Sequence, residues 1–369
     1  MELRAFLLAW RTTTLHDREV IDALVDPGHA GPSPALQAAL SRWPGHYYWS
    51  DESEGRHLIL TRPMVRRKRE RWVLHAALFL ATLLTTTFAG AVLTGAIPDA
   101  NPLDLFTGDY PLSPGLARAW TTGLVFSIPL LAILLCHEMG HYVAARWYQL
   151  DVSPPYFIPV PLFPTFIGTM GAFIRLRTLL SDRRQLLDVG VAGPLAGFAI
   201  ALPVLWIGLT FSHPPPGHGE LSGMLVTMGG GTYALGDSLI TLGLRWLTHG
   251  GTRTLLLHPL AFAGWVGMFV TMLNLLPISQ LDGGHIMYAA LPRVHTRVAL
   301  ACWALILGLG AFWAGWLVWG FIVLILSRGR LGHPPVLDAY RPLPTSRRWL
   351  AWAGLALLLI TFAPVPFRV

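Results

Sequence analysis

Two histidines and a glutamate stand together in an apolar part of the chain, as His137-Glu138-Met139-Gly140-His141. On a helix, residues four positions apart lie one turn apart on the same face, so both imidazoles can reach a single zinc ion. Glu138 is turned aside from them and can hold a water molecule on that metal as a general base. The preceding run, Leu131 to Leu135, has no polar residue, and these groups need a partner to lie in an apolar helix. The alternative is a polar helix face packed against another helix without metal.

A catalytic zinc site also needs a third protein ligand and one open position. Asp282 is the candidate, because it ends an apolar run, follows the helix-breaking Pro277 and precedes two glycines that allow close backbone approach. The alternative is a solvated Asp282 at the end of a helix that Gly283 caps. The two histidines favour the first interpretation, so the pattern predicts one Zn²⁺ per chain, held by His137, His141 and Asp282.

Two further polar residues near Asp282 need an interpretation. The amide of Asn274 could donate to a substrate carbonyl or its oxyanion, or it could form a hydrogen bond between helices, and both interpretations stay open. His285 follows the two glycines. Because three ligands are already assigned, we place His285 beside the metal rather than on it.

Composition sets the class of protein. Of the 369 residues, 53% are hydrophobic and 13% are charged, whereas a soluble domain has about a quarter charged residues. Several apolar runs are long enough to cross a bilayer. The chain is therefore predicted to be a polytopic α-helical membrane protein, not a soluble enzyme. The net charge of +7 reflects arginines at the ends of these runs, which argues for orientation signals and against nucleic-acid binding.

We expect about seven spans, at residues 72–97, 119–148, 186–211, 258–281, 298–326 and 349–363, with residues 298–326 forming either one long tilted helix or a helical hairpin. Basic residues at both ends of that segment favour the hairpin. The basic block at residues 66–71 should lie on the cytoplasmic side, and with it the N-terminus. Arginine greatly outnumbers lysine, which favours a bacterial source and the bacterial cytoplasmic membrane.

We divide the chain into three parts. Residues 1–64 form a small soluble α+β appendage, with helical patterns at 18–25 and 34–43 and two strands around 47–49 and 58–60. Residues 65–330 form the membrane core, and residues 331–369 form a cytoplasmic loop and the last span.

Between the second and third spans, a proline-rich stretch at 154–165 is followed by a β-like segment at 168–177. Both are too short to span, so we predict a re-entrant β-like hairpin covered by protein or water. An exposed edge strand there could pair with an extended peptide. Gly168, Gly171, Ala172 and Phe173 are the candidate substrate-binding residues.

The two motifs resemble the signatures of the site-2 protease family of intramembrane zinc metalloproteases, H-E-x-x-H and N-x-x-P-x-x-x-L-D-G on separate spans. Here they run from His137 to His141 and from Asn274 to Gly283, and both match in full. The stretch from Gly193 to Gly197 is similar to the G-P-x-A-G of the family, and we interpret it as helix packing near the metal. The chain looks most like the branch of plastid and bacterial homologues without a PDZ domain.

The resemblance implies zinc bound by the three predicted ligands and a water, activated by Glu138, that attacks a peptide bond. The expected partners are a transmembrane protein substrate and membrane lipid, and not nucleic acid. A catalytically silent member that acts as a binding or chaperone module is the main alternative, since some plastid members have lost H-E-x-x-H. A metal transporter would need a polar route across the membrane, and the first and last spans have no acidic or amide residue to build one.

Overall fold

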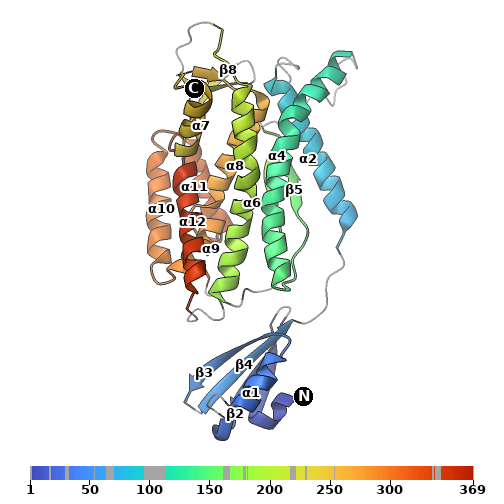
Figure 1. The fold of residues 1–369 in the computed structure, drawn as a ribbon, viewed down its shortest axis with the longest axis vertical. Helices are drawn as coiled ribbons and strands as arrows, with labels where there is room; N and C mark the ends of the chain where they lie inside the picture. The colour runs from blue at the N-terminus through green and yellow to red at the C-terminus, as the bar shows by residue number, and fades with distance from the viewer. Residues whose placement is uncertain are drawn as a thin grey trace.

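The computed structural model describes residues 2–15, 18–29, 33–53, 55–63, 70–94, 114–160, 167–177, 180, 182–216, 222–228, 231–252, 254–334, 336 and 342–368. Figure 1 shows two parts, a small N-terminal domain and a larger bundle of roughly parallel helices. A small sheet covers the end of the bundle farthest from the N-terminal domain, and the C-terminus lies there.

The N-terminal domain is an antiparallel sheet packed against one helix, as the predicted α+β class requires. Its elements are β1 (Leu7–Leu15), β2 (Arg18–Val25), α1 (Pro34–Ser41), β3 (His46–Glu52) and β4 (Gly55–Pro63), and the strand order is β1-β2-β4-β3. The predicted β3–β4 hairpin and the predicted helix after residue 34 are confirmed.

The predicted helix at residues 18–25 is wrong, because this segment is strand β2. Its buried side chains recur at every second position, at Ile21, Ala23 and Val25, which is the period of a strand. Pairing with β1 on one side and β4 on the other supplies the backbone hydrogen bonds of β2, so the tertiary context decides this segment.

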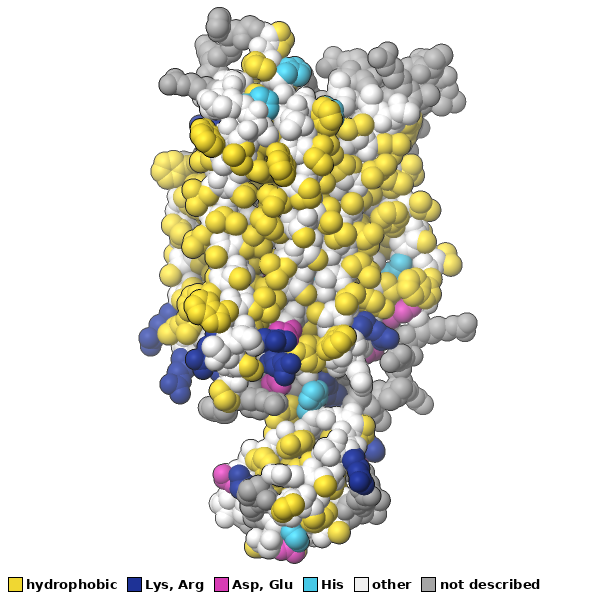
Figure 2. All heavy atoms as spheres, in the orientation of Figure 1, with side chains coloured by type: hydrophobic (Ala, Val, Ile, Leu, Met, Phe, Trp, Pro, Cys, Tyr) yellow, Lys and Arg dark blue, Asp and Glu magenta, His cyan; other side chains and the backbone are white. Residues whose placement is uncertain are grey.

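Within the described residues, three helices are long and apolar enough to cross a membrane: α2 (Trp72–Leu93), α4 (Pro114–Trp147) and α6 (Arg183–Thr210). The remaining predicted spans coincide with shorter helices, so the number of seven spans stays a prediction. These shorter helices are α8 (Pro259–Asn274), α10 (His295–Leu309), α11 (Gly315–Leu326) and α12 (Thr345–Thr361). Hydrophobic side chains cover the middle of the bundle, and lysine and arginine gather at the end near the N-terminal domain (Figure 2).

Residues 298–326 form a helical hairpin and not one long helix, since α10 ends at Leu309 and α11 begins at Gly315. The indole Nε1 of Trp303 donates a hydrogen bond to the backbone oxygen of Gly320, at 3.0 Å. This bond joins the two helices side by side.

The β-like segment also forms as predicted, as strand β6 (Thr169–Phe173), which pairs antiparallel with β5 (Tyr156–Pro159). β5 lies against α2, where the ring of Phe79 meets that of Phe157 edge-on at 5.0 Å. The connection at residues 161–166 lies outside the described residues, and with it the tip of the predicted re-entrant hairpin.

Charged groups tie this hairpin to the start of α2. Arg177, which follows β6, donates from Nη2 to Oε2 of Glu70 at 3.1 Å, and its Nη1 lies 3.3 Å from Asp151. The hydrogen bonds from Arg177 lower the pKa of the Glu70 carboxyl. The hairpin is therefore held from both sides, by α2 and by the end of α4.

The far end of the bundle carries the second sheet, in the order β10-β8-β7-β9. Its strands are β7 (Gly223–Met228), β8 (Gly231–Leu235), β9 (Thr254–Leu256) and β10 (Phe367–Arg368), and helix α7 (Leu239–His249) lies between β8 and β9. The last strand places the ring of Phe367 edge-on to Trp265 of α8, at 5.2 Å.

Helix α6 lies in the centre of the bundle, between α4 and α8, because small residues let the backbones meet. A Cβ added to Gly208 would lie 2.2 Å from the backbone nitrogen of Ala261, so no larger residue fits there. Phe126, Leu130, Leu205 and Phe262 fill the core between these three helices and are almost fully buried.

Asp188 joins three helices at the end of the bundle near the N-terminal domain. Arg347 of α12 donates to both of its carboxylate oxygens at 3.0 Å, and the hydroxyl of Tyr148 donates to one of them at 2.5 Å. Arg184 lies farther away, at 4.0 Å, and is half exposed. Arg347 is therefore the main cation bound to Asp188.

Replacing Arg347 with Met should destabilise the bundle, because Asp188 would keep its negative charge in a partly buried place without its main partner. We expect a loss of about 1 to 2 kcal/mol, seen as a fall of about 2 to 5 °C in the midpoint of thermal unfolding in detergent. Arg184→Met is the matched control and should shift the midpoint by less than about 1 °C. Equal shifts in the two variants would contradict the assignment.

Candidate metal centre

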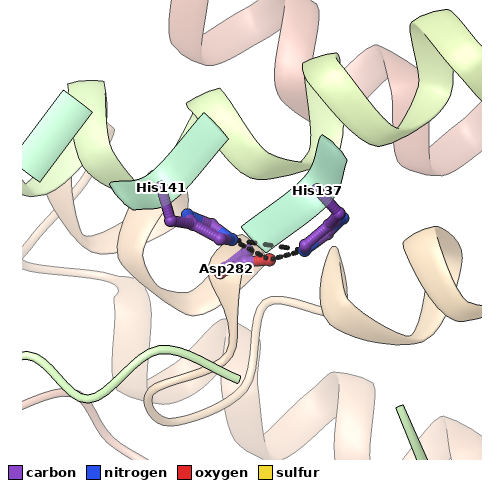
Figure 3. A group of neighbouring side chains, drawn as sticks. All are labelled: His137, His141 and Asp282. Carbon is purple, nitrogen blue, oxygen red and sulfur yellow. Dashed lines mark hydrogen bonds and ion pairs between the residues drawn. The ribbon is translucent and has the colours of Figure 1, made fainter. Parts of the chain in front are cut away.

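The two histidines of the H-E-x-x-H motif and Asp282 converge on one point (Figure 3). The Nε2 atoms of His137 and His141 lie 3.2 Å from each other, and Oδ2 of Asp282 lies 3.2 Å from the first and 3.3 Å from the second. His137 and His141 are buried in α4, whereas Asp282 is the first residue of α9 (Asp282–Ala290). Two separate helices therefore supply the three atoms.

These distances fit a tetrahedral zinc site. With zinc–ligand distances of about 2.0 to 2.1 Å, neighbouring ligands of a tetrahedral site lie about 3.3 to 3.4 Å apart. Two imidazole lone pairs and a carboxylate oxygen at this spacing repel one another unless a cation lies between them. Three protein ligands leave the fourth position for water or substrate.

A hydrogen bond behind the site orients His141. Its Nδ1 lies 2.7 Å from the backbone oxygen of Val189 on α6, and a carbonyl can only accept, so Nδ1 carries the proton. The lone pair is then on Nε2, the atom that faces Asp282. This contact selects the tautomer that a metal ligand needs.

Two glycines of α6 make room for the imidazoles. A Cβ on Gly193 would lie 2.0 Å from Nε2 of His141, and a Cβ on Gly197 would lie 3.0 Å from Nδ1 of His137. The expectation that this glycine motif packs near the metal is confirmed, and the packing is directly against two of the ligands. Residue size at position 193 therefore controls the position of His141.

A tight turn between α8 and α9 places Asp282. After α8 ends at Asn274, the chain turns through Pro277 and through Ser279, whose φ is +50°. A Cβ on Gly283 would lie 1.7 Å from the backbone oxygen of Leu275, so only glycine allows the two helices to approach this closely. Asp282 is the first residue of α9 and does not lie at a helix C-terminus. The alternative, a helix end capped by Gly283, is therefore wrong.

Asn274 and Glu138 both lie at this centre. Nδ2 of Asn274 is 3.4 Å from Nε2 of His137, the same nitrogen that faces Asp282. Glu138 is buried, and its carboxylate forms a hydrogen bond with the backbone of Ile174, just after β6. Both side chains line a cavity of about 490 Å³ together with the three candidate ligands.

Strand β6 and the residue after it form one wall of this cavity, which Ala172, Phe173 and Ile174 line. Arg175 directs both of its backbone groups toward Ser153, on the β5 side of the hairpin. Because backbone groups alternate in direction along a strand, those of Ala172 and Ile174 point away from β5. The unpaired edge of β6 therefore faces the metal centre.

The other two candidate substrate-binding residues are placed differently. Gly168 packs on α2, where its backbone oxygen accepts a hydrogen bond from Thr85 at 2.6 Å, so it does not line the cavity. Gly171 has a φ of +102°, and a Cβ there would meet nothing within 4 Å. Backbone conformation, and not close packing, explains glycine at position 171.

Comparison with known families agrees with this geometry. The model of peptidase family M50 matches residues 125–309, half of the chain, and this segment contains both motifs. The chain belongs to peptidase family M50. Membership confirms the resemblance to the site-2 protease family that the two motifs indicate.

Three relatives of this chain are plant proteins. The chain is 34% identical to the probable zinc metalloprotease EGY1, chloroplastic, of Oryza sativa over 70% of its own length and 44% of that protein. It is 34% identical to the Arabidopsis thaliana protein of the same name, over 64% of this chain and 42% of the relative. A third, the Arabidopsis probable zinc metallopeptidase EGY3, is 25% identical over 89% of this chain and 58% of the relative. The chain thus spans about half the length of these relatives, and no solved structure matches it significantly.

Sequence reasoning missed part of the M50 site. His333 comes from the segment after α11, and no motif marks it. Gln280 lies within the second motif, but nothing about its type suggests a place in the cavity. The lining residues that were not among the candidate site residues are Ile174, Leu176, Leu180, Leu186, Val189, Gly190, Gln280, Leu281, His333, Pro334 and Val336. Most are apolar and reach the cavity through the tertiary fold.

Replacing Gly193 with Ala should remove most of the bound zinc, because the new methyl group would occupy the place of the His141 ring. Gly197→Ala should cause a smaller loss, since a contact of 3.0 Å can relax by a few tenths of an ångström. Gly308→Ala on α10 is the control, because a Cβ there meets nothing within 4 Å. Elemental analysis of zinc per chain gives the result, with thermal unfolding measured on the same samples. A full zinc complement in Gly193→Ala would contradict the predicted role of His141.

Proposed function

We propose that this M50 member is an intramembrane zinc metalloprotease that hydrolyses peptide bonds within the transmembrane segments of other proteins. The observation that carries the proposal is the convergence of His137, His141 and Asp282 at tetrahedral spacing inside an apolar bundle. The names of the plant relatives support zinc and proteolysis, and the apolar helices support a membrane location.

The chemistry follows from the residues around that point. Zinc held by the three side chains would supply Lewis-acid chemistry, polarising a carbonyl and acidifying water. The Glu138 carboxylate takes a proton from the water that attacks the carbonyl carbon. The same carboxyl then gives this proton to the leaving nitrogen, so the carboxylate is regenerated in each turnover.

Asn274 is suited to bind the substrate carbonyl. If His137 holds zinc through Nε2, that nitrogen would have no lone pair left for Asn274, which lies 3.4 Å away. The amide hydrogens of Asn274 are then available to the carbonyl oxygen as it gains negative charge. This favours the oxyanion interpretation of Asn274 over a hydrogen bond between helices.

The free edge of β6 is suited to hold the substrate in extended form. A helical substrate uses its carbonyls in its own hydrogen bonds, so it must unwind before it can be cut. The outward backbone groups of Ala172 can replace those bonds by pairing with an added strand, next to Ile174, whose backbone is hydrogen-bonded to Glu138. A substrate bound in this way would have its scissile bond between β6 and the candidate ligands.

The place of the site along α4 supports cleavage near one face of the membrane. His137 lies about 15 Å from the end of α4 at Trp147, the end of the bundle near the N-terminal domain. Lysine and arginine gather at this end, which is the pattern of a cytoplasmic face (Figure 2). We therefore propose a cytoplasmic N-terminus and cleavage in the cytoplasmic half of the bilayer. The proposed bacterial location rests on the excess of arginine over lysine, and membrane lipid would surround the apolar helices.

Glu138→Gln should abolish proteolysis while zinc binding and folding persist, because Gln keeps the size of Glu but cannot accept the proton. We expect a fall in kcat of at least about 100-fold toward a single-span substrate in detergent or liposomes. Zinc content and thermal unfolding should match those of the wild-type protein.

Wild-type rates in Glu138→Gln would exclude this residue as the general base. A zinc-loaded, well-folded wild-type protein that cuts no single-span substrate would instead favour the silent binding module.

Ala172→Pro should impair cleavage without loss of zinc, because proline removes an N–H that points to the free edge of β6. The candidate ligands lie on α4 and α9 and do not depend on that donor. We expect most activity to be lost, and part of it to return with substrates that carry helix-breaking residues near the scissile bond.

The matched control is Ala172→Val, which keeps the N–H and suits a strand. Cleavage should stay closer to the wild-type rate in this variant. Wild-type cleavage by a well-folded Ala172→Pro protein would show that the substrate is held elsewhere.

A further inference from the structure

A second pair of histidines lies in the wall of the catalytic cavity and does not belong to the metal centre. His285 is on α9, one turn after Asp282, and His333 lies in the segment that follows α11. Nδ1 of His285 is 2.8 Å from Nε2 of His333, and both residues line the cavity. Neither belongs to the group of candidate ligand atoms that lie within 4.8 Å of one another.

The neighbours of His333 decide where the protons are. Its Nδ1 is in hydrogen-bond contact with the backbone oxygen of Pro334, and a carbonyl can only accept, so Nδ1 carries a proton. In a neutral ring Nε2 then has the lone pair. The short contact between the two rings therefore requires that Nδ1 of His285 is the donor. This leaves a lone pair on Nε2 of His285.

The surroundings also hold both rings in place. Tyr288 stacks on His333 with the ring centres 4.6 Å apart, and the backbone N–H of His333 donates to Nδ1 of His295 at 3.3 Å. On the other side, a Cβ on Gly190 would lie 2.8 Å from Cβ of His285, so α6 is in close contact with that residue. The ring of His285 is fixed before any substrate binds.

The lone pair on Nε2 of His285 has no partner among the described residues. The N–H groups of a helical peptide lose their hydrogen-bond partners when the peptide unwinds. A free acceptor in the cavity can accept a hydrogen bond from one of them. Strand β6 supplies donors and acceptors on one wall of the same cavity, and His285 supplies an acceptor on another.

We propose that Nε2 of His285 accepts a hydrogen bond from a backbone N–H of the unwound substrate, and that His333 is a positioning residue that fixes the tautomer of His285. This inference rests on the proposed proteolytic function and extends it to substrate binding. His285 and His333 bind no metal in this arrangement.

A pair of substitutions separates this role from a purely structural one. The side-chain oxygen of Gln reaches about as far as Nε2 of His, whereas the amide of Asn reaches only the Nδ1 position and so keeps only the contact with His333. We expect His285→Asn to raise KM for a single-span substrate roughly 3- to 10-fold, with a smaller change in kcat. This is the effect of losing one neutral hydrogen bond. His285→Gln should stay within about 2-fold of wild type. The reverse order, with Asn active and Gln impaired, would show that the pair only fastens α9 to the segment after α11.

Binding gives a readout that does not need turnover. In a zinc-loaded Glu138→Gln background, the affinity for a fluorescent single-span peptide should fall on adding His285→Asn and should be nearly unchanged on adding His285→Gln. If the wild-type protein cuts nothing, the proteolytic function fails, and this measurement still decides whether His285 binds an unwound peptide. Equal affinities in all three proteins would overturn the proposal. Zinc content and thermal unfolding of every variant show whether the protein is folded.

The protons can be located directly. Nitrogen NMR of the protein labelled with ¹⁵N-histidine should show a proton on Nδ1 and a bare Nε2 for His285. His333→Phe keeps an aromatic ring against Tyr288 but removes the acceptor, so the signal of His285 should change to a mixture of tautomers. A proton on Nε2 of His285 in the zinc-loaded wild-type protein would overturn the assignment.

Discussion

The structure depends on one arrangement of charge, in which two imidazole nitrogens and a carboxylate oxygen face each other within an apolar bundle. Each group alone is costly to bury, and without a cation the three repel one another. The helices that carry them must therefore be held together by contacts that do not involve the metal. The packing of α4 against α6 and the tight turn before α9 provide these contacts, so the site is organised in advance by the fold.

Helix α6 supplies no candidate ligand and yet determines the shape of the centre. Its Val189 carbonyl selects the tautomer of His141, Gly193 and Gly197 lie against the two imidazoles, and Gly190 lies against His285. The sequence signatures identify the reactive residues. The geometry of the site, however, depends largely on α6, which contributes a backbone carbonyl and glycines without side chains. A change on α6 can therefore alter the chemistry without touching a reactive group.

Features with a local cause could be predicted from the sequence. The spacing of His137 and His141 on a helix needs no tertiary information. The apolar runs predict most helices of the bundle, because a helix that crosses a bilayer must be long and apolar. Strand β2 was missed because a short segment of mixed apolar and charged residues fits a helix or a strand, and pairing with β1 and β4 decides between them. The contact of Gly168 with Thr85 and the contact of His285 with His333 each join segments that are far apart in the sequence. No local sequence pattern predicts such contacts.

Strand β10 has a consequence for the order in which the protein is made. Residues 367 and 368 complete a sheet whose other strands belong to the middle of the chain, and Phe367 fills a place among Trp265, Phe269 and Trp313. These residues follow all the helices that the structure describes, so they leave the ribosome after those helices. Until residues 367 and 368 have been synthesised, the space among these three aromatic rings stays open and the edge of β8 that pairs with β10 lacks its partner. The end of the bundle that carries this sheet therefore closes only after all the described helices have been synthesised.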